Sequence, residues 1–254
     1  TFTNGLVSCT GTPQTFTITI NPSGKVNQPD NQLLCYGSTV SAIAFSTPNT
    51  DGITTYTWTN NTPSIGLGAN DTGDIPAFTA LNIGTAPVVA TIEVTPHYAN
   101  GGISCDGQAK SFTITVNPTA QVNDPADQVV CNNASTSVHF TTNRTGGTTT
   151  YTWTNDNPDI GLVDHGSGDI SFTAINAGTS QIVAHLSVTP TYTNGLVSCT
   201  GYTQTFTIRV NPTGQVNQPD NQLVCNGSAT EAITFSTINT DGTTTYSWTN
   251  NATI

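Results

Sequence analysis

The six cysteines are the side chains of this sequence best suited to covalent chemistry, and they form two recurring sets. One set lies in a Ser-Cys-Thr/Asp-Gly phrase and the other follows a short apolar run; the members are Cys9, Cys105 and Cys199, then Cys35, Cys131 and Cys225. An even, recurring number of cysteines indicates disulfide bonds in a secreted chain. Zinc ligation is a poor alternative because no Cys-x-x-Cys pair or nearby His accompanies them. Reduced, buried thiols are the remaining alternative.

Catalytic chemistry would need an arrangement of residues that recurs, and the sequence has none. The histidines occupy unrelated positions in the chain, at His97, His139, His165 and His185. No Gly-x-Ser-x-Gly, His-Glu-x-x-His, phosphate-binding or dinucleotide-binding phrase is present. We therefore expect no catalytic residues, no enzymatic activity and no cofactor.

Acidic loops are the other candidates for ligand chemistry. Asp71 and Asp74 lie in Gly-Ala-Asn-Asp-Thr-Gly-Asp, and Asp164 and Asp169 lie in Val-Asp-His-Gly-Ser-Gly-Asp. Oxygen-rich loops can hold Ca²⁺, but the spacing differs between the two copies and neither supplies five or six ligands. Solvated turn carboxylates are the preferred interpretation, and a weak calcium site at these four residues is the alternative.

Charge and composition exclude several classes of function. The 254 residues carry a formal net charge of -11, and 7% of them are charged. Such an acidic chain has no basic surface for phosphates, which excludes nucleic-acid binding. No apolar run approaches the roughly 18 residues of a membrane span and no signal segment opens the sequence, so we expect no membrane insertion in this segment. The lack of Met leads us to expect a processed product or an excerpt of a longer protein.

One unit of about 95 residues recurs along the chain. A phrase opening with Asn-Pro begins at Asn21, Asn117 and Asn211, and residues 1–20 match residues 191–210 at 15 of 20 positions. We interpret residues 21–116 and 117–210 as whole repeats. Residues 1–20 are then the C-terminal strand or strands of a preceding repeat, and residues 211–254 are the N-terminal part of a following one.

Within each repeat, apolar residues alternate with Thr or another polar residue. Clear examples are Phe16/Ile18/Ile20, Phe112/Ile114/Val116 and Phe206/Ile208/Val210, together with Ile43/Phe45, Val138/Phe140 and Ile233/Phe235. A period of two predicts half-buried antiparallel strands. About seven short strands per repeat, separated by Gly-, Asn- and Pro-rich turns, predict an all-β fold of tandem two-sheet sandwiches.

An aromatic pair in the middle of the third expected strand favours an immunoglobulin-like version of this sandwich. Each Trp follows a Tyr by two residues, so both rings face the same side; the pairs are Tyr56/Trp58, Tyr151/Trp153 and Tyr246/Trp248. Rings on one face can fill the gap between two sheets, so we expect these residues in the core. A stacking platform for a ligand is the alternative.

Several phrases together resemble a known family. They are the strand-end Asn-Pro, the Cys-Tyr/Asn-Gly/Asn-Ser/Ala turn, the Tyr-Thr/Ser-Trp-Thr strand, the Val-Thr-Pro strand end and the Ser-Cys-Thr/Asp-Gly loop. Over essentially all 254 residues the chain resembles the tandem PKD-like, immunoglobulin-fold repeats of very large Bacteroidota surface proteins, including gliding-motility adhesins. The Trp-x-Phe-Gly-Asp-Gly phrase of PKD domains is absent, so no function of that loop is carried over.

The resemblance implies an extracellular adhesin or filament shaft on a bacterial cell surface, exported by the type IX route. Its partners would be further copies of the repeat in a longer chain and an unidentified surface or glycan ligand. The alternatives are a carbohydrate-binding or accessory module array of a secreted enzyme, and an S-layer or matrix protein. Outward strand aromatics, which binding modules display, are nearly absent. Tyr36 and Tyr202 are loop aromatics without Tyr counterparts in the other repeats.

The outer faces of the expected strands are rich in Thr, which suits a pleated strand and keeps its surface polar. Exposed strand edges are commonly guarded by Lys or Pro, and Lys is nearly missing here. Either bulges and turns cover the edges, or lateral strand contacts build a multi-stranded filament; we favour the second alternative, self-association of such chains through lateral contacts.

The pairing of the cysteines has three alternatives: sequence neighbours such as Cys9 with Cys35, partners within one repeat such as Cys35 with Cys105, or partners one repeat apart such as Cys35 with Cys199. In an immunoglobulin-like sandwich the two sets of cysteines lie at opposite poles, roughly 25 to 35 Å apart at about 3.3 Å per residue. Disulfide Cα atoms lie about 4.4 to 6.8 Å apart, which disfavours the pairing within one repeat.

Repeats stacked head to tail would bring Cys35 to Cys199, and we favour this pair. A hairpin at the Asn-Pro phrases would instead favour Cys9 with Cys35. Peptide mapping without reduction decides between them: we expect a Cys35–Cys199 peptide, and a Cys9–Cys35 peptide would refute the choice.

Overall fold

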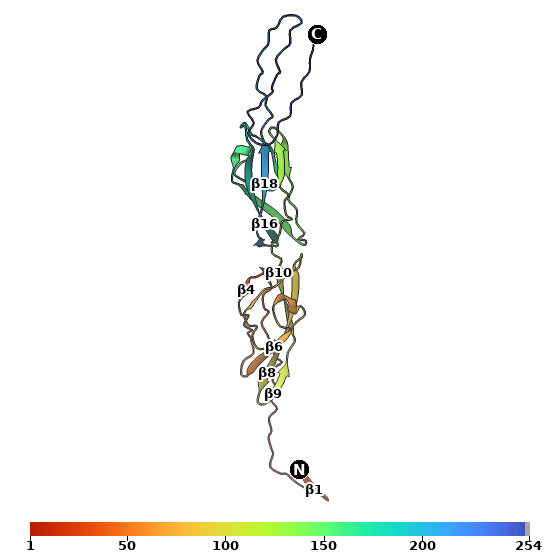
Figure 1. Cartoon of the computed structure of the whole chain (residues 1–254). Helices are drawn as coiled ribbons and strands as arrows, with labels where there is room; N and C mark the ends of the chain where they lie inside the picture. Colours follow the sequence, from red (N-terminus) through yellow and green to blue (C-terminus); the bar gives the residue numbers. More distant parts are fainter. Residues whose placement is uncertain (252–254) are drawn as a thin grey trace. The chain divides into compact units, whose positions relative to one another are not determined.

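The computed structural model describes residues 1–251 and consists of strands, loops and two short 3₁₀ helices (Figure 1). Its chain divides into two compact units. The first unit contains residues 1–32, 39–79 and 89–114, and the second contains residues 33–38, 80–88 and 115 onward. The second unit therefore includes a turn and a loop that belong, in sequence, to residues 21–116.

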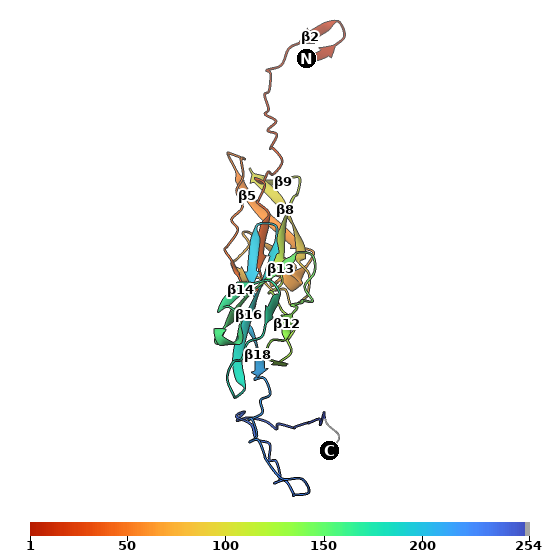
Figure 2. The same ribbon diagram turned by 90° about the horizontal axis from the view of Figure 1, so that it is seen from above.

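A long central strand, β16 (Ile182–Asn194), organises the main sheet of the second unit (Figure 2). Along one side, β18 (Gln204–Asn211) pairs antiparallel with the first half of β16 and β17 (Val197–Thr200) with its second half. On the other side lies β13 (Thr148–Asn155), which pairs with β14 (His165–Ser167). The sheet is completed by β11 (Gln128–Cys131), which adds to β18 in parallel.

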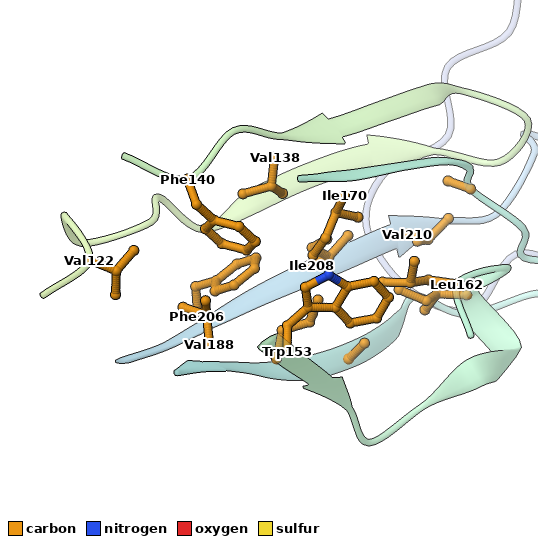
Figure 3. Close-up of a cluster of buried hydrophobic side chains, with 14 residues drawn as sticks. Val122, Val138, Phe140, Trp153, Leu162, Ile170, Val188, Phe206, Ile208 and Val210 are labelled. Atoms are coloured by element: carbon orange, nitrogen blue, oxygen red, sulfur yellow. The ribbon is translucent and has the colours of Figure 1, made fainter. Parts of the chain in front are cut away.

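A smaller sheet covers one face of this main sheet. It is formed by β12 (Ser135–Val138) and β15 (Ile170–Thr173), which pair antiparallel. Figure 3 shows side chains of this layer, including Val138 and Ile170, facing the rings and aliphatic groups of the main sheet. Phe206, Ile208 and Val210 are all buried, as the alternation along β18 predicts. The result is a β-sandwich.

The same strand order appears in a second sandwich, formed by residues 32–117. The main sheet contains β3 (Gln32–Cys35), β10 (Lys110–Asn117), β8 (Val88–Asn100), β5 (Ile53–Asn60) and β6 (Asn70–Thr72), with β9 (Ile103–Asp106) paired to β8. The smaller sheet contains β4 (Thr39–Val40) and β7 (Phe78–Thr79). The predicted fold class is confirmed: the protein is all-β and repeats an immunoglobulin-like sandwich.

One hairpin occurs three times with the same register. In β1 (Phe2–Asn4) and β2 (Val7–Cys9), Phe2 lies opposite Cys9, as Tyr192 lies opposite Cys199 in β16 and β17; β8 and β9 repeat the arrangement. Gly5 and Gly195 follow an Asn and have φ values of 62° and 56°, which a hairpin turn with Gly at its first central position requires. The hairpin of β1 and β2 therefore forms as a separate two-stranded sheet, without the neighbouring strands that it has in the two sandwiches.

Phe16, Ile18 and Ile20 do not lie in a core, contrary to the expectation from their alternation. Their exposed fractions are 84%, 78% and 87%, and no strand forms between β2 and β3. In the two sandwiches the corresponding residues pair with the first half of β8 or β16. Residues 1–20 contain only the counterpart of the second half, so this segment has no strand to pair with.

The aromatic pairs also divide according to the strands around them. Tyr56, Trp58 and Trp153 are buried and Tyr151 packs against the core. Trp248 is 73% exposed, which corrects the expectation that it is a core residue. The groups that bury Trp153 come largely from residues 160–210, whereas residues 211–251 correspond to the part of the repeat before these residues.

Tyr246 is only half-buried, and Ile233 is exposed. The ring of Tyr246 stacks on Phe235 with centroids 5.6 Å apart. This local aromatic contact is therefore present without a second sheet covering it.

A buried Asn at the end of the aromatic strand holds the loop that follows. The side-chain amide of Asn155 donates to the carbonyl of Leu162 at 2.8 Å, and its oxygen accepts the N–H of Asn157 at 3.1 Å. Asn60 repeats these roles with Leu67 and Thr62. The enclosed 3₁₀ turns are η1 (Pro63–Ile65) and η2 (Pro158–Ile160). These bonds satisfy backbone groups that water does not reach.

Replacing Asn155 by Ala should lower the free energy of unfolding by about 2 to 3 kcal/mol, because buried backbone groups lose their partners. Urea unfolding of the full chain measures the change. Thr154→Ala, at the exposed neighbouring position, is the control and should change stability by less than about 0.5 kcal/mol. Equal effects of the two substitutions would contradict the role of Asn155.

Candidate functional site at the repeat junction

Cys35 and Cys199 form a disulfide bond in the second unit. Their Cα atoms lie 5.6 Å apart although 164 positions separate them in sequence. Cys35 ends β3 and is followed by a turn, whereas Cys199 lies in β17 of the next sequence repeat. The structure thus joins the pair that the head-to-tail argument favoured. Cys9, Cys105, Cys131 and Cys225 carry free thiols.

The hairpin of β16 and β17 brings Cys199 to this position. At its tip, the side-chain amide of Asn194 donates to Oδ1 of Asn117, with 2.9 Å between the atoms. Asn21, which opens the preceding Asn-Pro phrase, bonds in turn to the carbonyl of Asn100 at 2.8 Å. The same two sequence positions therefore meet in both units, and only in the second does a cysteine bond accompany them.

A buried tyrosine positions the loop that makes a second contact at the junction. Tyr192 is fully buried, and its hydroxyl donates to the carbonyl of Thr145 at 2.8 Å. The N–H of Thr145 donates to the carbonyl of Thr85 at 2.9 Å. Burial raises the pKa of Tyr192, so the phenol stays protonated and remains a donor. Tyr192 thereby fixes the loop that meets residues 80–88.

The facing loop is held by Asn82. This buried side chain donates to the carbonyl of Val116 at 2.7 Å and accepts the N–H of Gly84 at 2.9 Å. Arg144 then reaches the loop: its Nη1 donates to the carbonyl of Gly84 at 2.9 Å and its Nε to the carbonyl of Thr119 at 2.8 Å. Hydrogen bonds within each side therefore hold both loops of the contact, through Asn82 on one side and Tyr192 on the other.

The junction pattern recurs one repeat later. The N–H of Thr240 donates to the carbonyl of Thr179 at 3.0 Å, and the amide of Asn239 donates to the carbonyl of Thr213 at 3.2 Å. Asn176 holds this loop through the carbonyl of Val210, as Asn82 does through Val116. The contact is therefore a property of the repeat and not of one pair of loops.

The cysteines signalled this junction in the sequence, whereas Tyr192, Asn82 and Arg144 did not. Tyr192 and Asn82 could have been found from the sequence, because both residues recur in the other repeat. A Tyr stands at both 98 and 192, and the phrase Ala-x-Asn-x-Gly-Thr places an Asn at 82 and 176.

The acidic loops bind backbone groups and histidines. Asp74 accepts the N–H of Phe45 at 2.9 Å, and Asp169 accepts the N–H of Phe140 at 3.0 Å. Asp71 accepts the N–H of Thr72, and Asp164 pairs with His165 at 2.7 Å. Within residues 1–251 no group of three or more His, Cys, Asp or Glu side chains is placed to hold a metal. The calcium alternative gains no support from this geometry.

One histidine lies in a Thr-His-Asp chain of hydrogen bonds. His97 Nε2 is 2.9 Å from the hydroxyl of Thr57, and its Nδ1 is 2.6 Å from Asp106. The order matches that of a hydrolase triad. However, the Thr57 and Asp106 side chains are exposed on an outer sheet face, where nothing excludes water from the hydroxyl. The equivalent positions of the next repeat are Thr152, Thr191 and Thr200, without a His.

No family model and no curated protein matches this chain. Similar solved structures include the three N-terminal domains of the Hoc capsid protein of bacteriophage RB49, 13% identical over 74% of this chain and 69% of that one, with a TM-score of 0.45. Mouse cadherin-23 EC22–24 is 16% identical over 72% and 63%, with a TM-score of 0.41. The human desmocollin-1 ectodomain is 13% identical over 78% and 43%, with a TM-score of 0.39. With these identities and TM-scores, the similar structures give no indication of function.

Residues 1–251 contain no helix that is both long and apolar enough to cross a membrane.

Asp169 should make stability depend on pH. The pKa of the Asp169 carboxyl group is lowered below its ordinary value, mainly by the hydrogen bond from the N–H of Phe140 and to a smaller extent by the hydrogen bond with His139. A lowered folded-state pKa means that the carboxylate stabilises the fold above the unfolded pKa of about 3.9 and that this stabilisation is lost as pH falls through the folded value. Asp169→Asn should therefore lower the melting temperature at pH 6 to 7 and have no effect once wild-type Asp169 is protonated.

Melting curves from pH 2 to 7 measure this difference. Asp220→Asn, an exposed position outside both sandwiches, is the control and should leave the melting temperature unchanged. A gap between Asp169→Asn and wild type that stays constant over the whole range would contradict the electrostatic role.

Proposed function

We propose that this chain is a non-enzymatic structural and adhesive shaft, part of a bacterial cell-surface or extracellular filament protein. Its repeats are residues 21–116 and 117–210, flanked by the end of a preceding repeat in residues 1–20 and the start of a following one in residues 211–254. The observation that carries the proposal is the Cys35–Cys199 bond, which ties a turn of one repeat to a hairpin of the next.

The junction contacts support a load-bearing role. The loop contact of Thr145 with Thr85 recurs as Thr240 with Thr179, so the same backbone hydrogen bond joins loops of successive repeats twice. A disulfide across such a contact limits how far the two repeats can separate. An array with that property holds a binding surface at a distance from its attachment point.

The same bond supports an extracellular location. Structural disulfides persist in oxidising surroundings outside the cytosol. The repeat phrases also resemble the PKD-like repeats of Bacteroidota surface proteins. This resemblance supports a location on the bacterial cell surface and a role in gliding motility. Lateral self-association into filaments fits the scarcity of Lys at the strand edges.

The alternative functions place the same fold in another setting. A carbohydrate-binding or accessory module array of a secreted enzyme needs aromatic side chains on an accessible surface, and Tyr36 and Tyr202 are such residues. An S-layer or matrix protein needs lattice contacts on the sandwich faces. The Thr57-His97-Asp106 chain does not favour an enzyme, because its hydroxyl is open to water.

Replacing both Cys35 and Cys199 by Ser should loosen the junction and leave the sandwiches folded. The core cluster of residues 122–210 lies within one repeat and contains neither cysteine, so far-ultraviolet circular dichroism should stay the same. Single-molecule energy transfer between dyes at positions 57 and 152 should show a wider distance distribution than in the wild type. The matched control, Cys131→Ser with Cys225→Ser, removes two free thiols and should not widen it. Equal distributions in all three proteins would contradict the stapled junction.

Location and activity are tested separately on the source bacterium. Antibodies against residues 21–210 should label intact cells or filaments outside them. Labelling only after permeabilisation would overturn the surface assignment. Hydrolysis of an activated ester should be equally slow for wild type and His97→Ala, whereas a loss of turnover in the variant would show that the Thr57-His97-Asp106 chain is catalytic.

A further inference from the structure

A hollow of about 250 Å³ lies at the junction in the second unit. Two tyrosines line it, Tyr36 from the turn after β3 and Tyr202 from the loop before β18, together with Arg144, Gln121, Gln204 and Ile83. The tyrosines are 40% and 82% exposed and Ile83 is 94% exposed. The volume is just below the about 300 to 1,000 Å³ of sites for drug-sized ligands, which suits one ring of a larger molecule.

Three of these lining residues do not recur in the repeats. Tyr36 has Asn132 and Asn226 as its counterparts, and Tyr202 has Thr12 and Gln108. Arg144 has Asn49 and Asn239. Departures from the repeat at three positions far apart in sequence therefore meet in one hollow.

The fold itself does not need these departures. At the next junction, Asn132 accepts the N–H of Asn176 at 2.8 Å and donates to the Thr213 hydroxyl at 2.9 Å. Among residues 1–251, the hydroxyl of Tyr36 has no such bond. Asn239 makes the carbonyl contact that Arg144 makes with Thr119. Asn at either position thus serves the junction, and the rings and the guanidinium are available for another role.

The charge of Arg144 is also unpaired. Only four Lys and Arg residues stand against 15 Asp and Glu in the chain, yet within residues 1–251 no carboxylate forms an ion pair with Arg144. Two of the five guanidinium N–H groups are used by the carbonyls of Gly84 and Thr119, which fix the group in place. Its other N–H groups are free to bind a planar anion such as a carboxylate.

We propose that this hollow binds a carboxylated sugar residue of an acidic polysaccharide, with Tyr36 and Tyr202 packing against the apolar face of the ring and Arg144 binding the carboxylate. The amide of Gln204 is placed to donate to and accept from a hydroxyl group at the rim, whereas the amide of Gln121 bonds to Asn123, Thr142 and Asn143. Aromatic rings with a few fixed polar groups are the usual composition of such sites. The site exists at this junction and is lacking at the next one, where Asn132 and Asn239 stand in place of Tyr36 and Arg144.

Trigalacturonate titrated into the full chain at low salt tests the proposal, with binding followed by calorimetry and by NMR shifts. Cellotriose is the uncharged control and triglutamate is the control for a carboxylate without a sugar. Trigalacturonate should bind saturably and at least about tenfold more tightly than either control, because both ring packing and ion pairing contribute. The shifted signals should belong to the residues that line the hollow.

Three variants take residue types from the other repeats, so the junction keeps its contacts: Tyr36→Asn, Tyr202→Gln and Arg144→Asn. The two tyrosine variants should each weaken binding at least about fivefold. Arg144→Asn should reduce the preference for trigalacturonate over cellotriose to within about twofold. Thermal unfolding confirms that each variant is folded.

Other outcomes overturn the site. They are the absence of saturable binding, equal binding of triglutamate or cellotriose, shifts confined to another surface, and unchanged affinity in the folded variants. The labelling and energy-transfer experiments on the shaft do not involve these residues, so the polysaccharide site and the structural function can fail independently.

Discussion

The length of the central strand is the constraint on which the junction depends. β16 extends over 13 residues, but β18 covers only Ile182–Val188 of it. The other half pairs with the short β17, which contains Cys199. Because a strand rises by about 3.3 Å per residue, this second half moves the hairpin tip roughly 15 to 20 Å beyond the end of β18. Every contact of Asn194 and Cys199 follows from that extension.

Alternation and recurrence were sufficient to predict most of the fold. Phe206, Ile208 and Val210 read as one face of a strand in the sequence and form one buried face in the structure. The recurring Tyr-x-Trp predicted where the sandwich core lies, and Trp58 and Trp153 are buried there. The cysteine argument required one further assumption, the head-to-tail order of repeats, and the observed bond has the partners which that assumption favours.

The rest depended on partners that no local pattern contains. Trp248 has nearly the same neighbours in sequence as Trp153, with Ser247 in place of Thr152, but its exposure is decided by strands that lie later in a repeat. The sequence analysis did not single out Arg144, because its carbonyl partners at Gly84 and Thr119 lie in loops distant in sequence. The hollow beside it needed three such loops to be placed together. The alternation of apolar residues predicts which face of a strand is buried. It does not predict which loops, distant in sequence, meet at a junction.

The bond between Cys35 and Cys199 also decides how the chain responds to tension. A pull on both ends passes through the two sulfur atoms and bypasses the residues enclosed between them. Those residues span 164 sequence positions, equivalent to about 550 Å of fully extended backbone, and they cannot be drawn out while the bond is intact. The bond therefore sets a redox-controlled limit on extension: in oxidising surroundings residues 36–198 add no length under tension, and reduction makes their length available without breaking the backbone.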